Sequence, residues 1–308
     1  MPESLKLVAL GDSIGYGLSA FPDRTNRSRS TLSGFNDQFA AFLSLHDDDY
    51  VNLACPGDKA ADLLMKLGRS DFQDEIAAAD ILTVSIGGNN LLGPSLDALC
   101  RLWDLNPADY VHAENRSLFS DLKEAIAARH ALEPDYRAEQ DFMRLANLRD
   151  PAAIACRIAL IRGIFAFSRE WPKIILQIRQ LNGRARIFVV TVPSPKRNGE
   201  ADNRFEDFYL AIEALANAIN RVIRKHRKGN PYQILDLNRI SREIPNAMTF
   251  DITGAMAASV RLMQTAPDDA AYAAHLLEFL EKSDLHPSYA GHVAVYEELR
   301  RCWTENRS

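Results

Sequence analysis

The sequence has no long hydrophobic run, few cysteines and no excess of basic residues. No apolar stretch approaches the roughly 18 residues needed to cross a bilayer, so a membrane span is excluded. The 36 Lys and Arg residues are outnumbered by 41 Asp and Glu residues. This balance provides no general basic surface for nucleic acid. The dense basic group from Arg221 to Lys228 is expected at a helix end, where cations interact favourably with the helix dipole.

The patterns of metal and nucleotide sites are also missing from the sequence. The four cysteines form no CxxC pair or Cys/His cluster, which argues against a disulfide framework and a zinc site. The seven histidines show no HExxH or comparable spacing. Neither GxGxxG nor GxxxxGK[ST] occurs, so a dinucleotide or nucleoside triphosphate site is not expected. The sequence therefore predicts neither a metal nor an organic cofactor.

The first residues of the sequence lack the features of a secretory leader. They run directly into an apolar strand pattern, without a basic region, an apolar stretch and a small-residue cleavage site. The expectation for the sequence as written is a cytoplasmic protein. Secretion stays open if a leader has been removed.

What the sequence does contain is a regular alternation of short apolar runs and helical patterns. The runs typical of buried strands are Leu5–Ala9, Tyr50–Ala54, Ile81–Ile86, Arg186–Val192 and Tyr232–Leu237. The helical patterns between them are Gly34–His46, Lys59–Leu67, Asp71–Ala79, Pro151–Leu181 and Phe205–Lys228. Strands that alternate with helices predict a parallel sheet covered on both faces. The expected fold is an α/β three-layer α/β/α sandwich of about five strands.

Two stretches depart from this alternation. Residues 91–150 hold no strand pattern but show short helical periodicities, and residues 246–283 also have a helical pattern. Neither has the composition of an interdomain linker. We therefore expect residues 1–308 to form one domain, with residues 91–150 as a helical, cap-like insertion. The apolar residues of Ile158–Ile178 are predicted to form a packing face, with a wall of a substrate site as the alternative.

Residues suited to catalysis follow three successive strands. Gly11-Asp12-Ser13 comes after the first strand, and glycine there permits a tight turn that exposes a serine hydroxyl. Gly57 comes after the second, where a glycine lets a backbone N–H approach a ligand. Asn89 and Asn90 come after the third and supply amide donors. Because ligands bind at the carboxyl ends of strands in open parallel sheets, these residues are expected at one site.

A histidine with an acid close by stands near the other end of the sequence, in Asp284-Leu285-His286-Pro287. Each of these four motifs alone is equally typical of a turn or a helix cap. Their order favours catalysis, because three follow successive strands and the fourth precedes a helix expected over residues 289–304.

Gly11-Asp12-Ser13-Ile14-Gly15 also fits the GxSxG nucleophile elbow of α/β-hydrolases. In that fold, the elbow follows a strand in the middle of the chain. Here it follows the first recognisable strand. The position therefore excludes the α/β-hydrolase fold.

The four motifs resemble the blocks of the SGNH hydrolase superfamily of GDSL-like lipases and esterases, in the same order from Gly11 to Pro287. The resemblance implies that Ser13 is the nucleophile and His286 the general base. It also implies an oxyanion hole formed by the N–H groups of Ser13 and Gly57 and by the side-chain amide of Asn89. The strings VSIGGNN and LNGRARIFVVTVP are most similar to the bacterial lipase and lysophospholipase branch. An SGNH/flavodoxin-like form of the sandwich is the implied fold.

The sequence departs from the family pattern at two positions. The aspartate of the GxND block is Asn90 here, for which we expect local structural consequences only. The family's acid three residues before the histidine is Ser283, whereas Asp284 lies two residues before it. We expect Asp284 to orient His286, because a carboxylate stabilises an imidazolium better than a neutral acceptor does. The alternative is a Ser–His dyad in which Ser283 or a backbone carbonyl orients the ring.

The resemblance implies a serine hydrolase that cleaves carboxylic (acyl) esters through an acyl-serine intermediate. His286 takes the proton of Ser13 and returns it to the leaving alcohol. The expected partner is a small-molecule ester, with lipids and lysophospholipids among the candidates, and no metal is required. Two alternatives stay open: a carbohydrate O-deacetylase, and a decayed site that only binds an acylated ligand or a protein.

Overall fold

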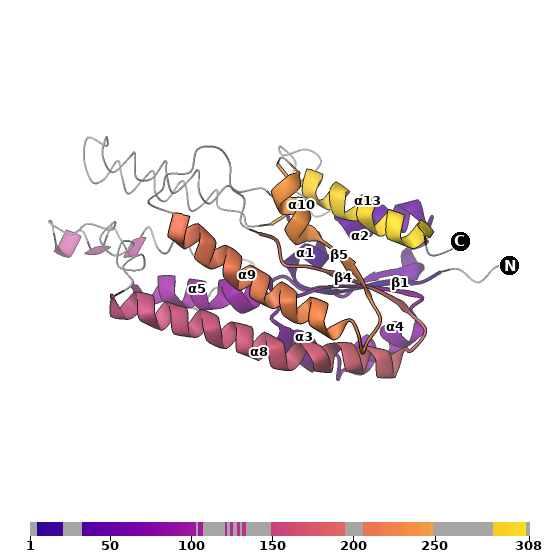
Figure 1. Ribbon diagram of the computed structural model, residues 1–308, viewed down its shortest axis with the longest axis horizontal. Coiled ribbons are helices and arrows are strands. Elements are labelled where there is room, and N and C mark those ends of the chain that lie inside the picture. Colours follow the sequence, from indigo (N-terminus) through magenta and orange to yellow (C-terminus); the bar gives the residue numbers. More distant parts are fainter. Residues whose placement is uncertain are drawn as a thin grey trace.

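The computed structural model describes residues 5–20, 33–102, 104–106, 121, 124–125, 128–129, 131–133, 149–194, 206–244, 246–248 and 286–305. Its centre is a five-stranded sheet whose strands all pair in parallel (Figure 1). The strands are β1 (Leu7–Gly11), β2 (Tyr50–Asn52), β3 (Ile81–Ser85), β4 (Arg186–Val190) and β5 (Gln233–Leu235). Their order is β2-β1-β3-β4-β5. The predicted five-stranded parallel sheet is confirmed.

The strands alternate their side chains between two hydrophobic layers, as the period of two in a strand requires. Leu7 of β1 is in register with Ile81 of β3, and both belong to one core cluster. The next residues, Val8 and Leu82, are also in register and belong to the other cluster. Because both faces of the central strands β1, β3 and β4 are buried, these strands are mostly apolar, which is why the sequence showed them as short apolar runs.

The larger layer of helices covers the face that carries Val8 and Leu82. It contains α3 (Ala60–Lys66), α4 (Ser70–Ala78), α5 (Gly88–Leu102), α8 (Pro151–Leu181) and α9 (Glu206–His226). Phe167 and Trp171 of α8 are fully buried in this layer and stack with ring centroids 5.7 Å apart. Both therefore belong to a packing face, as predicted.

The smaller layer covers the opposite face. It contains α1 (Ser13–Tyr16), α2 (Phe35–Phe42), α10 (Leu237–Glu243) and α13 (Tyr289–Glu305), and the short 3-10 helix η2 (Asp47–Asp49) leads into β2. Trp303 of α13 packs edge-on against Phe39 of α2, with ring centroids 6.1 Å apart. The guanidinium of Arg186 also contacts the Trp303 ring and lies 4.1 Å from its centroid. Two helical layers around the sheet give the three-layer sandwich.

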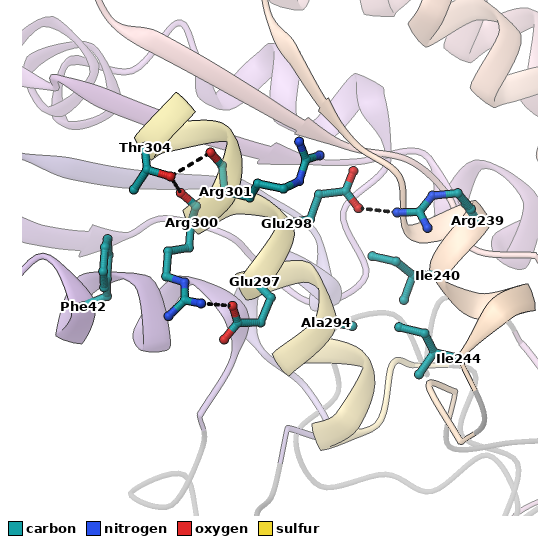
Figure 2. Close-up of a pocket in the computed structure, with 10 residues that line it drawn as sticks. All are labelled: Phe42, Arg239, Ile240, Ile244, Ala294, Glu297, Glu298, Arg300, Arg301 and Thr304. Carbon is teal, nitrogen blue, oxygen red and sulfur yellow. Dashed lines mark hydrogen bonds and ion pairs between the residues drawn. The ribbon is translucent and has the colours of Figure 1, made fainter. Parts of the chain in front are cut away.

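An open pocket lies on the outer surface of this smaller layer, between α2, α10 and α13 (Figure 2). An ion pair joins α10 to α13 there, with Arg239 3.0 Å from Glu298, and a second pair, Arg300 and Glu297 at 2.6 Å, lies along α13. None of the predicted site residues is among the ten described residues that line it. The pocket is therefore separate from the predicted site.

Several predicted strand and helix boundaries differ from those in the structure by one to four residues. The strand expected to reach Leu237 ends at Leu235, because the Asp236 side chain accepts a hydrogen bond from the backbone N–H of Arg239 (3.2 Å) and begins α10. The predicted insertion starts inside an element of the sandwich, since α5 begins at Gly88, runs to Leu102 and packs along α8. Most of residues 103–148 and nearly all of 246–283 lie outside the described residues, so the cap-like insertion and the single domain stay predictions. None of the described helices is long and apolar enough to span a bilayer.

Gly11, at the end of β1, has no room for a side chain. Its φ is +125°, and an added Cβ would lie 1.8 Å from the carbonyl oxygen of Ser85. We expect Gly11→Ala to lower the free energy of unfolding by at least about 3 kcal/mol, measured by urea denaturation. Gly229→Ala is the control, because nothing lies within 4 Å of its added Cβ. Equal stability of the two variants would contradict the prediction.

Candidate active site

Four of the predicted site residues, Ser13, Gly57, Asn89 and His286, lie at the carboxyl edge of the sheet. The strand order reverses between β1 and β3, which lie next to each other although β2 separates them in sequence. Ser13 follows β1 and Asn89 follows β3, so these two residues flank the point of reversal. In doubly wound sheets, this point is where the loops diverge and a ligand binds.

A tight turn places Ser13 at the start of a helix. The backbone N–H of Asp12 donates to the carbonyl of Ser85 (2.7 Å), which ties the turn to β3. The Asp12 side chain then caps α1 by accepting from the N–H of Ile14 (3.1 Å). Gly17 ends this single helical turn with a φ of +90°. Ser13 is therefore the first helical residue, held from both sides.

His286 reaches Ser13 from the other end of the chain. Its Nε2 lies 2.8 Å from the Ser13 Oγ, a hydrogen-bonding distance. Two backbone contacts hold the segment that carries His286. Met248 forms an isolated antiparallel β-bridge with Pro287, and the N–H of Ser288 donates to the carbonyl of Ala247 (2.8 Å). The structure thus brings together two of the predicted catalytic residues, which are 273 positions apart.

Gly57 and Asn89, which were predicted to complete the oxyanion hole, lie in the turn after β2 and at the start of α5. Gly57 has a φ of +88° in the turn after β2, and the N–H of Cys55 just before it donates to the carbonyl of Gly11 (2.8 Å). The Asn89 Nδ2 donates to the carbonyl of Asp58, 3.0 Å away. This bond joins the start of α5 to the glycine turn. An amide has two N–H donors, and this contact engages one of them.

Asn90, which replaces the family aspartate, connects three helices. Its Oδ1 accepts from the N–H of Ala60 in α3 (3.1 Å), and its Nδ2 donates to the carbonyl of Gly163 in α8 (3.4 Å). The side chain is 3% exposed. An aspartate would lack the donor for Gly163, so the asparagine serves the packing of these helices.

Sequence reasoning gave no role to Asp12, a buried acid next to Ser13. It is 2% exposed, and its Oδ1 accepts from the Ile14 N–H and the Ser85 hydroxyl (3.0 Å). Burial raises its pKa to about 6 from 3.8, although those hydrogen bonds and the electrostatic interaction with His286 lower it. The negative charge of Asp58 raises it slightly further. In the sequence, the available indication of a role for Asp12 was its position next to Ser13.

Asp58 is a second buried acid that the sequence did not reveal. It is 1% exposed, and its Oδ2 lies 2.6 Å from the Lys66 Nζ. Its backbone carbonyl accepts the amide of Asn89. The ion pair therefore anchors the turn that positions Asn89, and adjacency to Gly57 was the only sequence signal for it.

Asp284 and Ser283 lie outside the described residues. Their predicted relation to His286 stays a prediction. Within the part of the chain that the structure describes, no group of three or more His, Cys, Asp or Glu side chains is arranged to hold a metal ion. No disulfide joins any two of the four cysteines, all of which lie among the described residues: Cys55, Cys100, Cys156 and Cys302.

A parallel sheet in a three-layer sandwich, with a Ser–His contact at its carboxyl edge, defines an α/β enzyme of the hydrolase type. The chain belongs to the GDSL-like Lipase/Acylhydrolase family, whose model matches residues 9–294. The predicted family is thus confirmed over nearly the whole chain. Membership makes the protein a GDSL-type ester hydrolase. A comparison with curated proteins finds no match.

Solved structures with a similar fold include three lipolytic enzymes. The lipase Lip_vut3 from a goat rumen metagenome is 14% identical with a TM-score of 0.53, and 96% of each chain is covered. An extracellular lipase from Streptomyces rimosus is 17% identical with a TM-score of 0.52, covering 97% of this chain and 99% of that one. Phospholipase A1 from Streptomyces albidoflavus NA297 is 16% identical, with the same TM-score and coverage. At these identities, the likeness shows the shared fold.

The raised pKa of Asp12 predicts a pH-dependent stability. Between pH 3.8 and about 6, the native state keeps a proton that the unfolded chain releases, so the free energy of unfolding should fall as pH rises through this window. The size of the contribution is on the order of 3 kcal/mol. We expect Asp12→Asn to abolish this fall, because asparagine has no proton to lose and still accepts hydrogen bonds.

The measurement is urea denaturation at several pH values across that window. Asp71→Asn is the control, because Asp71 is exposed and its pKa is lowered by Arg69. The control should keep the fall in stability. A fall of the same size in Asp12→Asn would refute the assignment.

Proposed function

We propose that the protein hydrolyses carboxylic esters through an acyl-serine intermediate. The observation that carries the proposal is the 2.8 Å contact between the Ser13 Oγ and the His286 Nε2. A hydroxyl is a weak nucleophile until an adjacent base takes its proton. His286 removes this proton as Ser13 attacks the ester carbonyl, and then gives it to the departing alcohol. Water enters in the second half of the cycle, and the same base activates it to release the acid.

Negative charge that develops on the carbonyl oxygen needs donors at the same edge of the sheet. The N–H of Ser13 lies at the first turn of α1, where helix N–H groups are unpaired and the dipole favours an anion. The Gly57 turn and the Asn89 amide are joined next to it through Asp58. We propose these three donors as the oxyanion hole. Donors of this kind typically contribute about 3 kcal/mol each to the transition state.

We propose acyl esters of lipids as the substrate class. Support comes from the names of the three neighbours, which describe two lipases and a phospholipase A1.

Ser13→Ala is the direct test of this proposal. We expect the variant to lose at least about 10³-fold in turnover of p-nitrophenyl esters, because no other group can form the acyl-enzyme. Labelling by a fluorophosphonate probe should be lost at the same time. Ser70→Ala is the control, because Ser70 is an exposed serine at the start of α4. Full turnover or full labelling of Ser13→Ala would show that the proposal is wrong.

A second pair of variants tests the proposed third member of the triad, Asp284. We expect Asp284→Asn to reduce kcat by about 10²–10⁴-fold, because the imidazolium of His286 loses its negative partner. Ser283→Ala should change kcat only mildly. Steady-state kinetics with one soluble ester measures both. The reverse ranking would assign the orienting group to Ser283.

A further inference from the structure

The first half of α8 exposes a stripe of large apolar side chains. Ile154, Ile158 and Ile161 are 44%, 45% and 48% exposed, and Phe165 is 64% exposed. Their spacings of four, three and four residues place all four on one side of an α-helix. We call these four residues the α8 stripe. The sequence had predicted the apolar residues of Ile158–Ile178 as a packing face, and that prediction is wrong for Ile158, Ile161 and Phe165.

The packing face of α8 is a different one. Phe167, Trp171 and Ile174 are fully buried against the sheet layer, and at 100° per residue they point away from the α8 stripe. The helix is therefore apolar on two sides, and only one of them is used for the core. An exposed apolar surface of this kind usually marks an interaction site.

Basic residues border the α8 stripe on both sides. On a helical projection, Arg157 lies on one side of it, and Arg162 and Arg169 lie on the other. All three are exposed. Lys173 adds a fourth positive charge, and Glu170 is the one acidic residue between positions 151 and 173. A chain with a formal net charge of -5 thus concentrates positive charge around its exposed apolar helix.

The α8 stripe also lies at the catalytic end of the molecule. Gly163, within the stripe's span, accepts a hydrogen bond from Asn90 (3.4 Å), the neighbour of Asn89. The contact is close, since a Cβ added to Gly163 would lie 2.0 Å from the Asn90 carbonyl oxygen. In Figure 1, the first half of α8 extends with α5 past the strand ends that carry the site. One helix therefore contacts the site region with one side and exposes apolar residues on another.

We propose that the α8 stripe docks the enzyme on an anionic phospholipid surface. Exposed apolar residues bordered by arginines suit the boundary between headgroups and acyl chains, because the apolar side chains insert and the arginines contact phosphates. A second copy of the chain fits less well, since symmetric pairing along the stripe would bring the arginines of both copies together. The inference rests on the proposed function, because docking matters to catalysis when the ester belongs to a lipid.

The test compares vesicle binding with catalysis of a soluble ester. The full-length protein is floated with phosphatidylcholine vesicles and with vesicles that contain roughly one third phosphatidylglycerol. We expect binding to the anionic vesicles, weaker binding to the neutral ones, and loss of binding at high salt. The variant Ile161→Asp/Phe165→Asp should bind at least about tenfold more weakly, because each exposed side chain loses its apolar burial. Its turnover of p-nitrophenyl acetate should stay within about twofold of the wild type.

Phe42→Asp is the matched control, because Phe42 is 40% exposed on α2 in the opposite layer. It should bind vesicles like the wild type. The inactive Ser13→Ala should also bind them normally, which separates docking from the proposed catalysis. Absent vesicle binding by the wild type, or unchanged binding by the stripe variant, would overturn the docking proposal alone. A dimer in sedimentation that the stripe variant dissociates would also overturn it, in favour of a second copy.

Discussion

The close backbone contact between the ends of β1 and β3 is the constraint on which the site depends. Gly11 has no space for a side chain beside Ser85, and the next residue, Asp12, donates its N–H to the same carbonyl. This contact fixes where β1 stops and where α1 begins. The position of the Ser13 hydroxyl follows from it. Backbone atoms of β1 and β3 therefore occupy the point where the strand order reverses, and the residues of the candidate site lie around it.

The electrostatics at this edge of the sheet depend on two buried carboxyl groups, those of Asp12 and Asp58. Asp12 directs one carboxyl oxygen to the Ile14 N–H and the Ser85 hydroxyl, and its pKa is nevertheless raised because desolvation outweighs these bonds. Asp58 is balanced by Lys66 at 2.6 Å. The site thus keeps one acid in an ion pair and another that depends on hydrogen bonds. A buried carboxyl group whose charge is only partly compensated is typical of functional sites.

Much of the fold followed from the sequence because buried parallel strands are short and uniformly apolar. All five strands were predicted, with ends displaced by one or two residues, and at the end of β5 a side chain decided the boundary. Asp236 stops β5 by capping α10, although the apolar run continues to Leu237. Apolar periodicity also does not tell a buried face from an exposed one. Phe165 and Phe167 are two residues apart and equally apolar, yet one is exposed and the other is buried.

The candidate site was predictable to the extent that it lies in short motifs. Ser13 and His286 could be paired because the order of the four blocks resembled a known family. The roles of Asp12 and Asp58 depend on how deeply each carboxyl is buried, and burial is a tertiary property. The ion pair with Lys66 likewise joins a turn to a helix that only the fold brings together. Such features need coordinates, because residue type and spacing do not encode them.

The separation between Ser13 and His286 also has a consequence for biosynthesis. Most of the chain lies between these two residues, and a chain is made from its N-terminus at about 5–20 residues per second. The serine and its surrounding glycines therefore exist for many seconds on the ribosome before the imidazole is made. In the proposed mechanism, hydrolysis becomes possible only when α13 and residues 286–288 have packed against the rest of the fold. In that mechanism, the nascent chain has no hydrolytic activity until its synthesis and folding are nearly complete.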